Sequence, residues 1–378
     1  MTDPALPIAL FRSSPADFVV DEVPLYPPSG AGEHLHLVLR KTDVTTQDAV
    51  RAIARALDVD PRGVGVAGMK DKRAITTQAA TFPFPIARGA AADAAASIHV
   101  DGVEVLAAER HAHKLKPGHL AGNRFAITLR GLSRSGADDV ARGLADAAKR
   151  GVPNAYGPQR FGRDGDNPER ALAWLAGKER GPRDPNQQRF LFSALQSLLF
   201  NRVLERRVDG GSWDRVLPGD LAKKADFEGS ELEAVRHFGG LFAVPLEGDE
   251  LADVLARSAA GHVVATGPMF GAKMRWPDGA PAALERAILD EALGAASIAG
   301  EAAALTPFRH LGEGTRRSLV LPVNEVMTEI NEESPDTASL IVRFVLPKGG
   351  YATTVLQRLC VLKEGHGAAR EAERDDVA

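Results

Sequence analysis

The chain has 378 residues, of which 44% are hydrophobic and 25% are charged, and its formal net charge is −4. A chain of this length provides for two or three domains, each with enough apolar residues for its own core. The acidic balance argues against a protein that coats nucleic acid without selectivity, although a local basic surface is enough to bind phosphates.

Cysteine content and hydropathy indicate the compartment. The single cysteine, Cys360, excludes a disulfide framework and is typical of a reducing cytosol. Residues 1–30 lack a basic segment followed by a long apolar run, and no window approaches about 18 uninterrupted apolar residues. We therefore expect a cytoplasmic protein that does not enter a membrane.

Strand and helix patterns alternate over the first 150 residues. Residues 34–41, HLHLVLRK, show the apolar–polar alternation of a half-buried strand, and Thr45 or Thr46 begins a helix with Ala49 and Ile53 on its inner face. In chain order, the patterns predict a strand over residues 18–26, a strand over 34–41, a helix over 48–59, a strand–turn–strand unit over 64–82, a strand over 124–131 and a helix over 138–151.

Helical patterns dominate from residue 167 onward. Residues 169–177 and 188–208 read as helices, and 280–304 is rich in Ala and Glu, whereas 339–362 returns to strand chemistry before a short helix. We expect the apolar stripe of the long helix to include Phe190, Leu191, Ala194, Leu198 and Phe200. Strand-rich ends around a helix-rich middle predict one domain, residues 1–165 and 305–378, interrupted by an inserted domain at 166–304.

One segment runs against the acidic balance of the chain. Residues 110–125, RHAHKLKPGHLAGNRF, carry four Lys or Arg residues, three histidines and no acid. His111, His113 and His119 could be metal ligands, but no cysteine accompanies them and lysines crowd the same segment. We favour phosphate-facing or solvated histidines over a metal site.

Other common site patterns are absent or incomplete. The glycines of GAGEHL precede a strand and lack the third glycine of a dinucleotide fingerprint. RDGDN resembles the start of a calcium loop, but Leu175 stands at the twelfth position from Asp164, where such loops carry Glu. There is no G-x-S-x-G motif, and Cys360 lies in an apolar run that indicates core packing.

The stretch VGVAGMKDKRAITTQAATF, residues 64–82, places one carboxylate among three cations. Lys70, Asp71, Lys72 and Arg73 occupy the turn between two apolar runs. A charged turn is most often simply solvated. Nearby positive charge nevertheless favours an ionised carboxylate, which suits electrostatic or nucleophilic work and not general acid work.

The motif AGMKDKRAITTQ resembles the signature of the TruD family of pseudouridine synthases, whose nucleophilic aspartate follows Gly-x-Lys. Further blocks fall in the order typical of the family: DFVVDEVPL, GEHLHLVLRKTDVTTQDAV, HKLKPGHLAGNRFAITLR, GVPNAYGPQRFGRDGDN and RFVLPKGGYATTVLQRL. The resemblance covers most of residues 8–205 and 315–362 and is weakest in the middle of the chain.

The resemblance implies a fold and a reaction. The fold is α+β, the pseudouridine-synthase fold with a mixed, mainly antiparallel sheet flanked by helices, plus an inserted α/β TRUD domain. The reaction isomerises a flipped-out uridine, at position 13 of tRNA, to pseudouridine, with Asp71 as the nucleophile, no cofactor and no metal. Attack at C1′, attack at C6 and a glycal route remain open. tRNA is the expected partner of a monomeric enzyme.

The resemblance also implies substrate-binding residues. Phe18, Asn123 and Tyr351 fall at uridine-pocket positions, because aromatic rings can stack on a base and an amide can pair with its edge. Taken singly, each has an ordinary structural explanation: a core Phe18, a turn-forming Asn123 and a packed Tyr351.

Four other residues are expected to support the site or contact RNA: Arg12, Lys70, Phe125 and Arg160. Arg12 stands where the family commonly has lysine, which preserves charge but not geometry. Three rival functions remain at this stage: a family enzyme with another RNA target, an RNA-binding protein without chemistry, and a metal-dependent hydrolase that uses the histidines.

Overall fold

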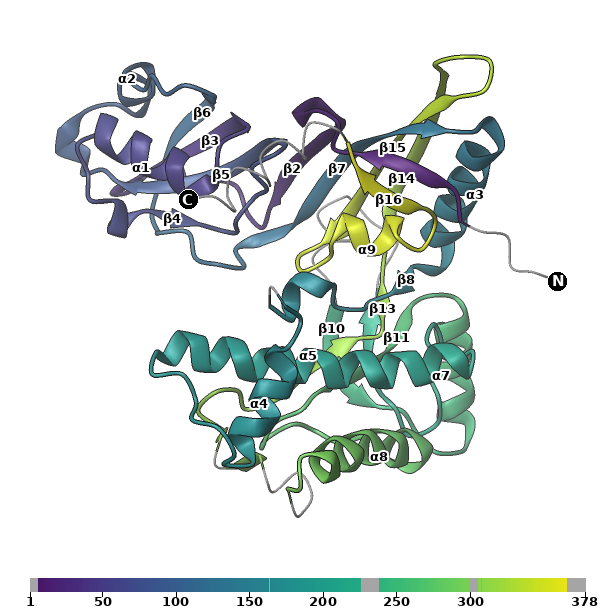
Figure 1. Ribbon diagram of the computed structural model, residues 1–378. Helices are drawn as coiled ribbons and strands as arrows, with labels where there is room; N and C mark the ends of the chain where they lie inside the picture. The colour runs from purple at the N-terminus through teal and green to yellow at the C-terminus, as the bar shows by residue number, and fades with distance from the viewer. Residues whose placement is uncertain (1–5, 163, 226–237, 299–304, 307, 366–378) are drawn as a thin grey trace. The chain divides into compact units, whose positions relative to one another are not determined.

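The computed structural model describes residues 6–162, 164–225, 238–298, 305–306 and 308–365. The chain divides into two units (Figure 1). One is formed by the residues up to Lys149 together with those from Val323 onward, and the other by Arg150–Pro322. The segment 166–304, which the sequence predicts as an insertion, lies within the second unit.

The first unit is built on a sheet of ten strands. Its main path runs β14-β15-β7-β2-β5-β3-β6, with β1, β4 and β16 attached at the side. Among the described strands, only β2–β5 and β1–β16 pair in parallel, so the sheet is mixed and mainly antiparallel, as predicted. The strands are β1 (Ile8–Phe11), β2 (Phe18–Pro24), β3 (His34–Thr42), β4 (Gly65–Val66), β5 (Ile75–Pro83), β6 (Val103–His111), β7 (Leu120–Leu132), β14 (Asn324–Glu332), β15 (Ala338–Pro347) and β16 (Val361–Glu364).

Hydrophobic alternation decides which face of this sheet is covered. In β3, Leu35, Leu37 and Leu39 are all buried and pack in one cluster with Ile53 of α1 (Thr46–Ala56). The Thr45 side chain caps that helix by accepting a hydrogen bond from the backbone N–H of Asp48. The remaining α-helices described in this unit are α2 (Ala91–Ala96), α3 (Arg134–Arg150) and α9 (Ala352–Leu356).

The register of the central strands fixes the position of the site. Opposite residues of an antiparallel pair share a face of the sheet. β2 pairs with β7 so that Phe18 lies opposite Ile127, Val20 opposite Phe125, and Glu22 opposite Asn123. The parallel pairing of β2 with β5 sets Val19 beside Ile75, so the turn before β5 lies at the start of β2.

The second unit holds a smaller sheet, in the order β10-β9-β11-β12, and a two-stranded sheet of β13 and β8. All of these pairs are antiparallel, which is an α+β arrangement and differs from the α/β insertion expected from the sequence. The elements are β8 (Val152–Pro153), α4 (Asn167–Leu175), α5 (Pro185–Asp209), β9 (Leu221–Ala225), β10 (Phe238–Ala243), α7 (Asp249–Ala259), β11 (Val263–Met269), α8 (Gly279–Ala295), β12 (Thr315–Ser318) and β13 (Val320–Leu321).

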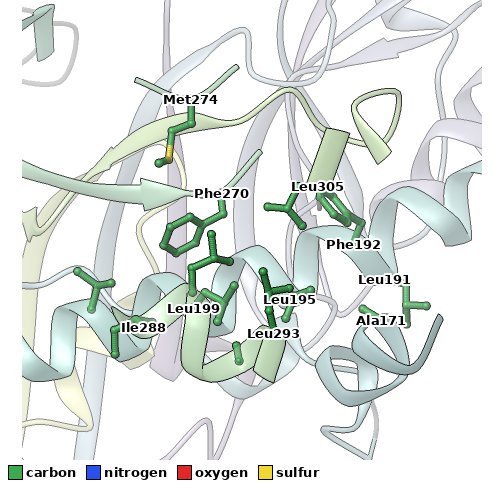
Figure 2. Close-up of a cluster of buried hydrophobic side chains, with 13 residues drawn as sticks. Ala171, Leu191, Phe192, Leu195, Leu199, Phe270, Met274, Ile288, Leu293 and Leu305 are labelled. Carbon is green, nitrogen blue, oxygen red and sulfur yellow. The ribbon is translucent and has the colours of Figure 1, made fainter. Parts of the chain in front are cut away.

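One hydrophobic core cluster of the second unit forms where α5 meets α4 and α8. Figure 2 shows side chains of these helices converging with Phe270 and Met274. The long helix differs from its prediction at one end, because Phe190 is 44% exposed whereas Phe192 is fully buried in this cluster. Leu191, the next residue of the expected stripe, is buried in the same cluster, so the stripe was predicted to begin one residue too early.

Two expectations about hydrophobic segments can be compared with the structure. Cys360 is fully buried, and burial raises the pKa of its thiol to about 11, so the residue packs in the core as expected. Among the described residues, no helix is both long and apolar enough to cross a bilayer.

Candidate active site

Asp71 lies on the turn between β4 and β5, in the first unit. Its side chain is 51% exposed, and its carboxylate oxygen Oδ1 lies 3.2 Å from Nη2 of Arg12. An ionised carboxylate open to solvent and fixed by one guanidinium can meet a substrate that approaches from outside. This pair is the centre of the candidate site.

Arg12 is held more firmly than an ordinary surface arginine. Its guanidinium carbon lies 4.1 Å from the ring centre of Phe18 and 4.8 Å from that of Phe11, which is the geometry of cation–π contacts. Its backbone has a φ of +56°, a left-handed conformation that few non-glycine residues adopt. A planar guanidinium stacked in this way reaches Asp71 with little freedom to move.

Lys41 holds the main chain of the same turn. Its side chain is only 1% exposed, and Nζ donates to the carbonyl oxygen of Asp71 at 2.7 Å and lies 3.5 Å from that of Lys70. Burial lowers the pKa of the Lys41 ammonium to about 8, against the opposing effect of Asp71. The turn therefore rests on a buried cation.

Lys70 points inward, away from solvent. Its Nζ lies 2.6 Å from Oε2 of Glu22, and the two side chains are 5% and 3% exposed. Oε1 of Glu22 accepts a hydrogen bond from the backbone N–H of Ala79 at 3.2 Å. The sequence predicted that Lys70 supports the site or contacts RNA; its buried ion pair favours support of the turn over contact with RNA.

A hydrogen-bonded chain from α1 completes the cradle of the turn. The backbone N–H of Lys70 donates to Oγ1 of Thr46 at 3.1 Å, and that hydroxyl bonds Oε1 of Gln78 at 2.9 Å. Gln78 in turn lies 3.4 Å from the carbonyl oxygen of Gly68. Backbone groups of Gly68 and Lys70, in the first half of the turn, are thus bound to side chains of a helix and a strand.

Phe18 and Phe125 lie on the same face of the sheet as Glu22, the partner of Lys70. Phe18 is 2% exposed and Phe125 is 6% exposed, with ring centres 6.3 Å apart. Phe125 also packs against Phe344, with ring centres 5.5 Å apart. Since Arg12 lies over the ring of Phe18, this phenylalanine positions the guanidinium and does not present an open stacking face to a base.

Asn123 offers an unpaired hydrogen-bond acceptor. It stands opposite Glu22 in the β2–β7 register, and its Oδ1 is buried with no donor among the described residues. Native structures seldom leave such an atom unpaired without a functional reason. The amide is therefore suited to a ligand group that enters the site.

Tyr351 and Arg160 lie in different parts of the chain. Tyr351 is 42% exposed and immediately precedes α9, after a turn in which Gly349 has a φ of +80°. Arg160 belongs to the second unit, where its guanidinium lies 5.5 Å from the ring centre of Tyr156 and donates to Oγ of Ser197 at 3.2 Å. Arg12, Phe18, Asp71, Asn123, Phe125 and Tyr351 all belong to the first unit.

Sequence reasoning did not identify Lys41, Glu22 or Thr46. A signal for Lys41 was present: the alternation that turns Leu35, Leu37 and Leu39 inward also places Lys41 on the buried face. A lysine at an inward-facing position of a strand needs a buried partner, which here is the turn. No comparable signal marked Glu22, since charged residues are common in half-buried strands.

The histidines contact aromatic rings and one another. His111 stacks on Tyr26 with ring centres 5.8 Å apart, and His119 Nδ1 lies 2.6 Å from the Tyr26 hydroxyl. Burial lowers the pKa values of His36 and His111 below the ordinary range. Within the part of the chain that the structure describes, no three His, Cys, Asp or Glu residues are arranged to hold a metal ion.

Comparison with known proteins places this chain in a family. The family model described as tRNA pseudouridine synthase D (TruD) matches residues 8–177 and 182–359. The chain belongs to the TruD family. A tRNA pseudouridine synthase D from an Anaeromyxobacter species is 41% identical, covering 92% of this chain and 91% of its own length. The protein of that name from Thermus thermophilus is 40% identical, covering 92% and 87%.

A solved structure supports the fold. The putative tRNA pseudouridine synthase D (TruD) from Methanosarcina mazei superposes with a TM-score of 0.70, covering 95% of this chain and 94% of that one, at 24% identity. Every candidate residue, from Arg12 to Tyr351, lies inside the segments that the TruD family model matches. The α+β pseudouridine-synthase fold expected from the sequence is confirmed.

The buried ion pair beneath the turn can be tested through stability. Glu22→Gln would leave the Lys70 ammonium buried without a counter-charge, and breaking such a pair costs about 3 to 5 kcal/mol. Chemical denaturation should show this loss, and the double variant Glu22→Leu, Lys70→Met should recover part of it, because the buried charge is gone but the backbone N–H of Ala79 still loses its acceptor. A loss below about 1 kcal/mol for Glu22→Gln would contradict the account.

Lys41 predicts a particular dependence of stability on pH. Its pKa is about 8 in the folded chain and about 10.4 in an unfolded one, so the unfolded chain binds more protons between these values. The free energy of unfolding of the wild type should therefore rise between about pH 8 and 10, relative to Lys41→Met, by about 1 to 3 kcal/mol. Exposed Lys149→Met is the control and should follow the wild type; parallel curves for the wild type and Lys41→Met would refute the prediction.

Proposed function

We propose that this chain isomerises uridine 13 of tRNA to pseudouridine, with Asp71 as the nucleophile. The observation that carries the proposal is the exposed carboxylate of Asp71, paired at 3.2 Å with an arginine stacked on two phenylalanine rings. The names of the relatives specify a tRNA pseudouridine synthase and support the substrate.

The reaction breaks the N1–C1′ glycosidic bond, turns the uracil and forms a C5–C1′ bond. The proton displaced from C5 is balanced by the proton that N1 gains, so the product is an isomer of the substrate. Asp71 can attack C1′, attack C6 or assist a glycal route, and the proposal leaves these open. In each, an ionised carboxylate must be held close to the reacting nucleotide.

The surrounding residues divide the remaining work. Uridine must leave the RNA stack to reach Asp71, and its edge then needs hydrogen-bond partners. Asn123 supplies an acceptor for the N3–H of uracil, and the exposed ring of Tyr351 supplies a stacking surface. Arg12 orients the carboxylate, Phe11 and Phe18 keep Arg12 in place, and Phe125 packs against Phe18.

The finer assignments rest on the family and on the substrate. Position 13 is the site associated with the TruD family, and tRNA places the enzyme in the cytoplasm. We propose that the enzyme works without metal or cofactor, because the isomerisation involves no net oxidation or reduction and balances within the nucleotide. A monomer remains our proposal for the oligomeric state. Arg160 is proposed as an RNA contact of the second unit.

The decisive test is a pseudouridine assay on an unmodified tRNA transcript. Wild type should form pseudouridine at position 13, whereas Asp71→Asn, which keeps size but removes the charge, should form none at the same RNA occupancy. Asp101→Asn, an exposed aspartate in the same unit, is the matched control and should act like the wild type. Product from Asp71→Asn would remove Asp71 from the mechanism, and no product from a wild type that binds tRNA would favour a binding protein or another RNA target.

Asn123 allows stability and activity to be separated. Asn123→Leu removes a buried acceptor that is unpaired in the free protein, so the free energy of unfolding should stay level or rise by about 1 kcal/mol. Loss of the contact to uracil should lower kcat/KM for tRNA by about 100-fold or more. A variant that loses stability and keeps its activity would show that Asn123 is structural.

A further inference from the structure

Residues 113–119, here called the lysine loop, connect two parts of the candidate site. The backbone N–H of Gly118 donates to the carbonyl oxygen of Ala67 at 2.8 Å, at the start of the Asp71 turn. On the other side, the loop contacts Lys348, which lies three residues before Tyr351. The Lys348 Nζ is 3.5 Å from the carbonyl oxygen of Gly118. The lysine loop therefore borders both the Asp71 turn and the Tyr351 turn.

Buried contacts fix the shape of the lysine loop. Leu115 is 4% exposed, and its backbone N–H donates to Oγ1 of Thr81 at 2.9 Å. A Cβ atom at Gly65 would come within 2.3 Å of the Leu115 carbonyl oxygen, so the loop lies directly against β4. The alternate residues Lys114 and Lys116 are exposed on either side of this anchor.

The lysine loop carries positive charge that the protein does not neutralise. In the described part of the chain, no carboxylate lies within ion-pair distance of Lys114 or Lys116, or of Lys348, which contacts the loop at Gly118. Nζ of Lys114 donates at 3.0 Å to a carbonyl oxygen, that of Arg62, which places the ammonium without cancelling its charge. The whole chain has a net charge of −4, so this concentration of cations is local.

Exposed lysines on a fixed loop are suited to phosphate groups. Lysines that serve only to keep a surface solvated need no fixed position. An RNA backbone beside a flipped uridine presents its phosphates at fixed positions, and lysines on a fixed loop can match them. Anchoring by Leu115 lowers the entropy that the loop loses on binding. We propose that Lys114 and Lys116 bind backbone phosphates of the RNA next to the target nucleotide, an inference that rests on the proposed function.

The experiment compares two double variants with the same loss of charge. Lys114→Gln, Lys116→Gln alters the lysine loop, and Arg51→Gln, Lys149→Gln removes two exposed cations from α1 and α3. Binding of unmodified tRNA is measured over a series of KCl concentrations. The slope of log K against log [KCl] reports the phosphates neutralised, at roughly 0.7 to 0.9 for each.

We expect the loop variant to lower the magnitude of this slope by about 1.5 and to weaken binding at about 100 mM KCl by 10-fold or more. The control double variant should keep the wild-type slope, and Lys114→Arg, Lys116→Arg should restore it, because arginine retains the charge. Equal slopes for the two glutamine variants would overturn the inference.

This result can be separated from the proposed function. A wild type that binds tRNA but makes no pseudouridine would refute the proposed activity, while the slopes would still decide the role of the lysine loop. A wild type that makes pseudouridine, with a loop variant equal to the control, would refute only the inference. A wild type whose tRNA binding does not depend on salt would also overturn it.

Discussion

The candidate site depends on two lysine side chains buried beneath one turn. Lys41 is 1% exposed as a whole residue, and the side chain of Lys70 is 5% exposed. At such positions an ammonium group is costly unless it is bound. Lys70 finds a carboxylate in Glu22, and Lys41 finds the carbonyl oxygens of the turn. Each cation is satisfied only if the turn adopts one conformation, so the cost of burial specifies the position of Asp71.

The main chain and the side chain of Asp71 are held by different elements. Lys41, at the end of β3, holds the carbonyl group, and Arg12, which follows β1, holds the carboxylate. The start of β5 pairs with the end of β3 and with the start of β2, which brings these elements to the same end of the sheet. An aspartate fixed at both ends loses little freedom when a substrate arrives, which is how a carboxylate that stays half exposed can still be well oriented.

The sequence predicted the parts of the fold that depend on local pattern. Residues 34–41 lie in β3 and residues 124–131 in β7, because their alternation of apolar and polar residues matches the two faces of the sheet. The exposed strand β14 was not predicted, since strand pairing with β15 and not burial maintains it. Phe190 was misplaced because the face that α5 buries is set by α4 and α8, which no local pattern reveals.

The site was predictable only in part for the same reason. The motif singled out Asp71 as a candidate, but it did not reveal the partners of Lys70 and Lys41, which come from β2 and from the turn, far away in sequence. Glu22 is 48 residues from Lys70, and Lys41 is 30 residues from Asp71. Register between strands creates these contacts, and a single sequence does not fix register. The role of Phe18 also changed with the structure, because only three-dimensional packing shows that Arg12 covers its ring.

Buried charge alone does not distinguish this site, as the second unit demonstrates. There, Arg207 pairs with Asp220 and Arg316 pairs with Glu285, all at most 4% exposed at the side chain. Further hydrogen bonds surround both arginines: Arg207 donates to two backbone carbonyl oxygens, and Arg316 donates to the hydroxyl and the carbonyl oxygen of Thr266. Such networks are complete within the protein and stabilise a single packing.

The first unit is different because its polar groups around Asp71 are incompletely satisfied. Arg12 has a left-handed backbone and a buried Nε without a partner among the described residues, and Oδ1 of Asn123 has none either. Strain and unpaired polar atoms lower stability, so a unit that keeps them together with an exposed Asp71 carboxylate is suited to bind a polar ligand. A uracil edge that pairs with Asn123 would complete the network only when substrate is present. That hydrogen bond would then stabilise the complex and not the free protein.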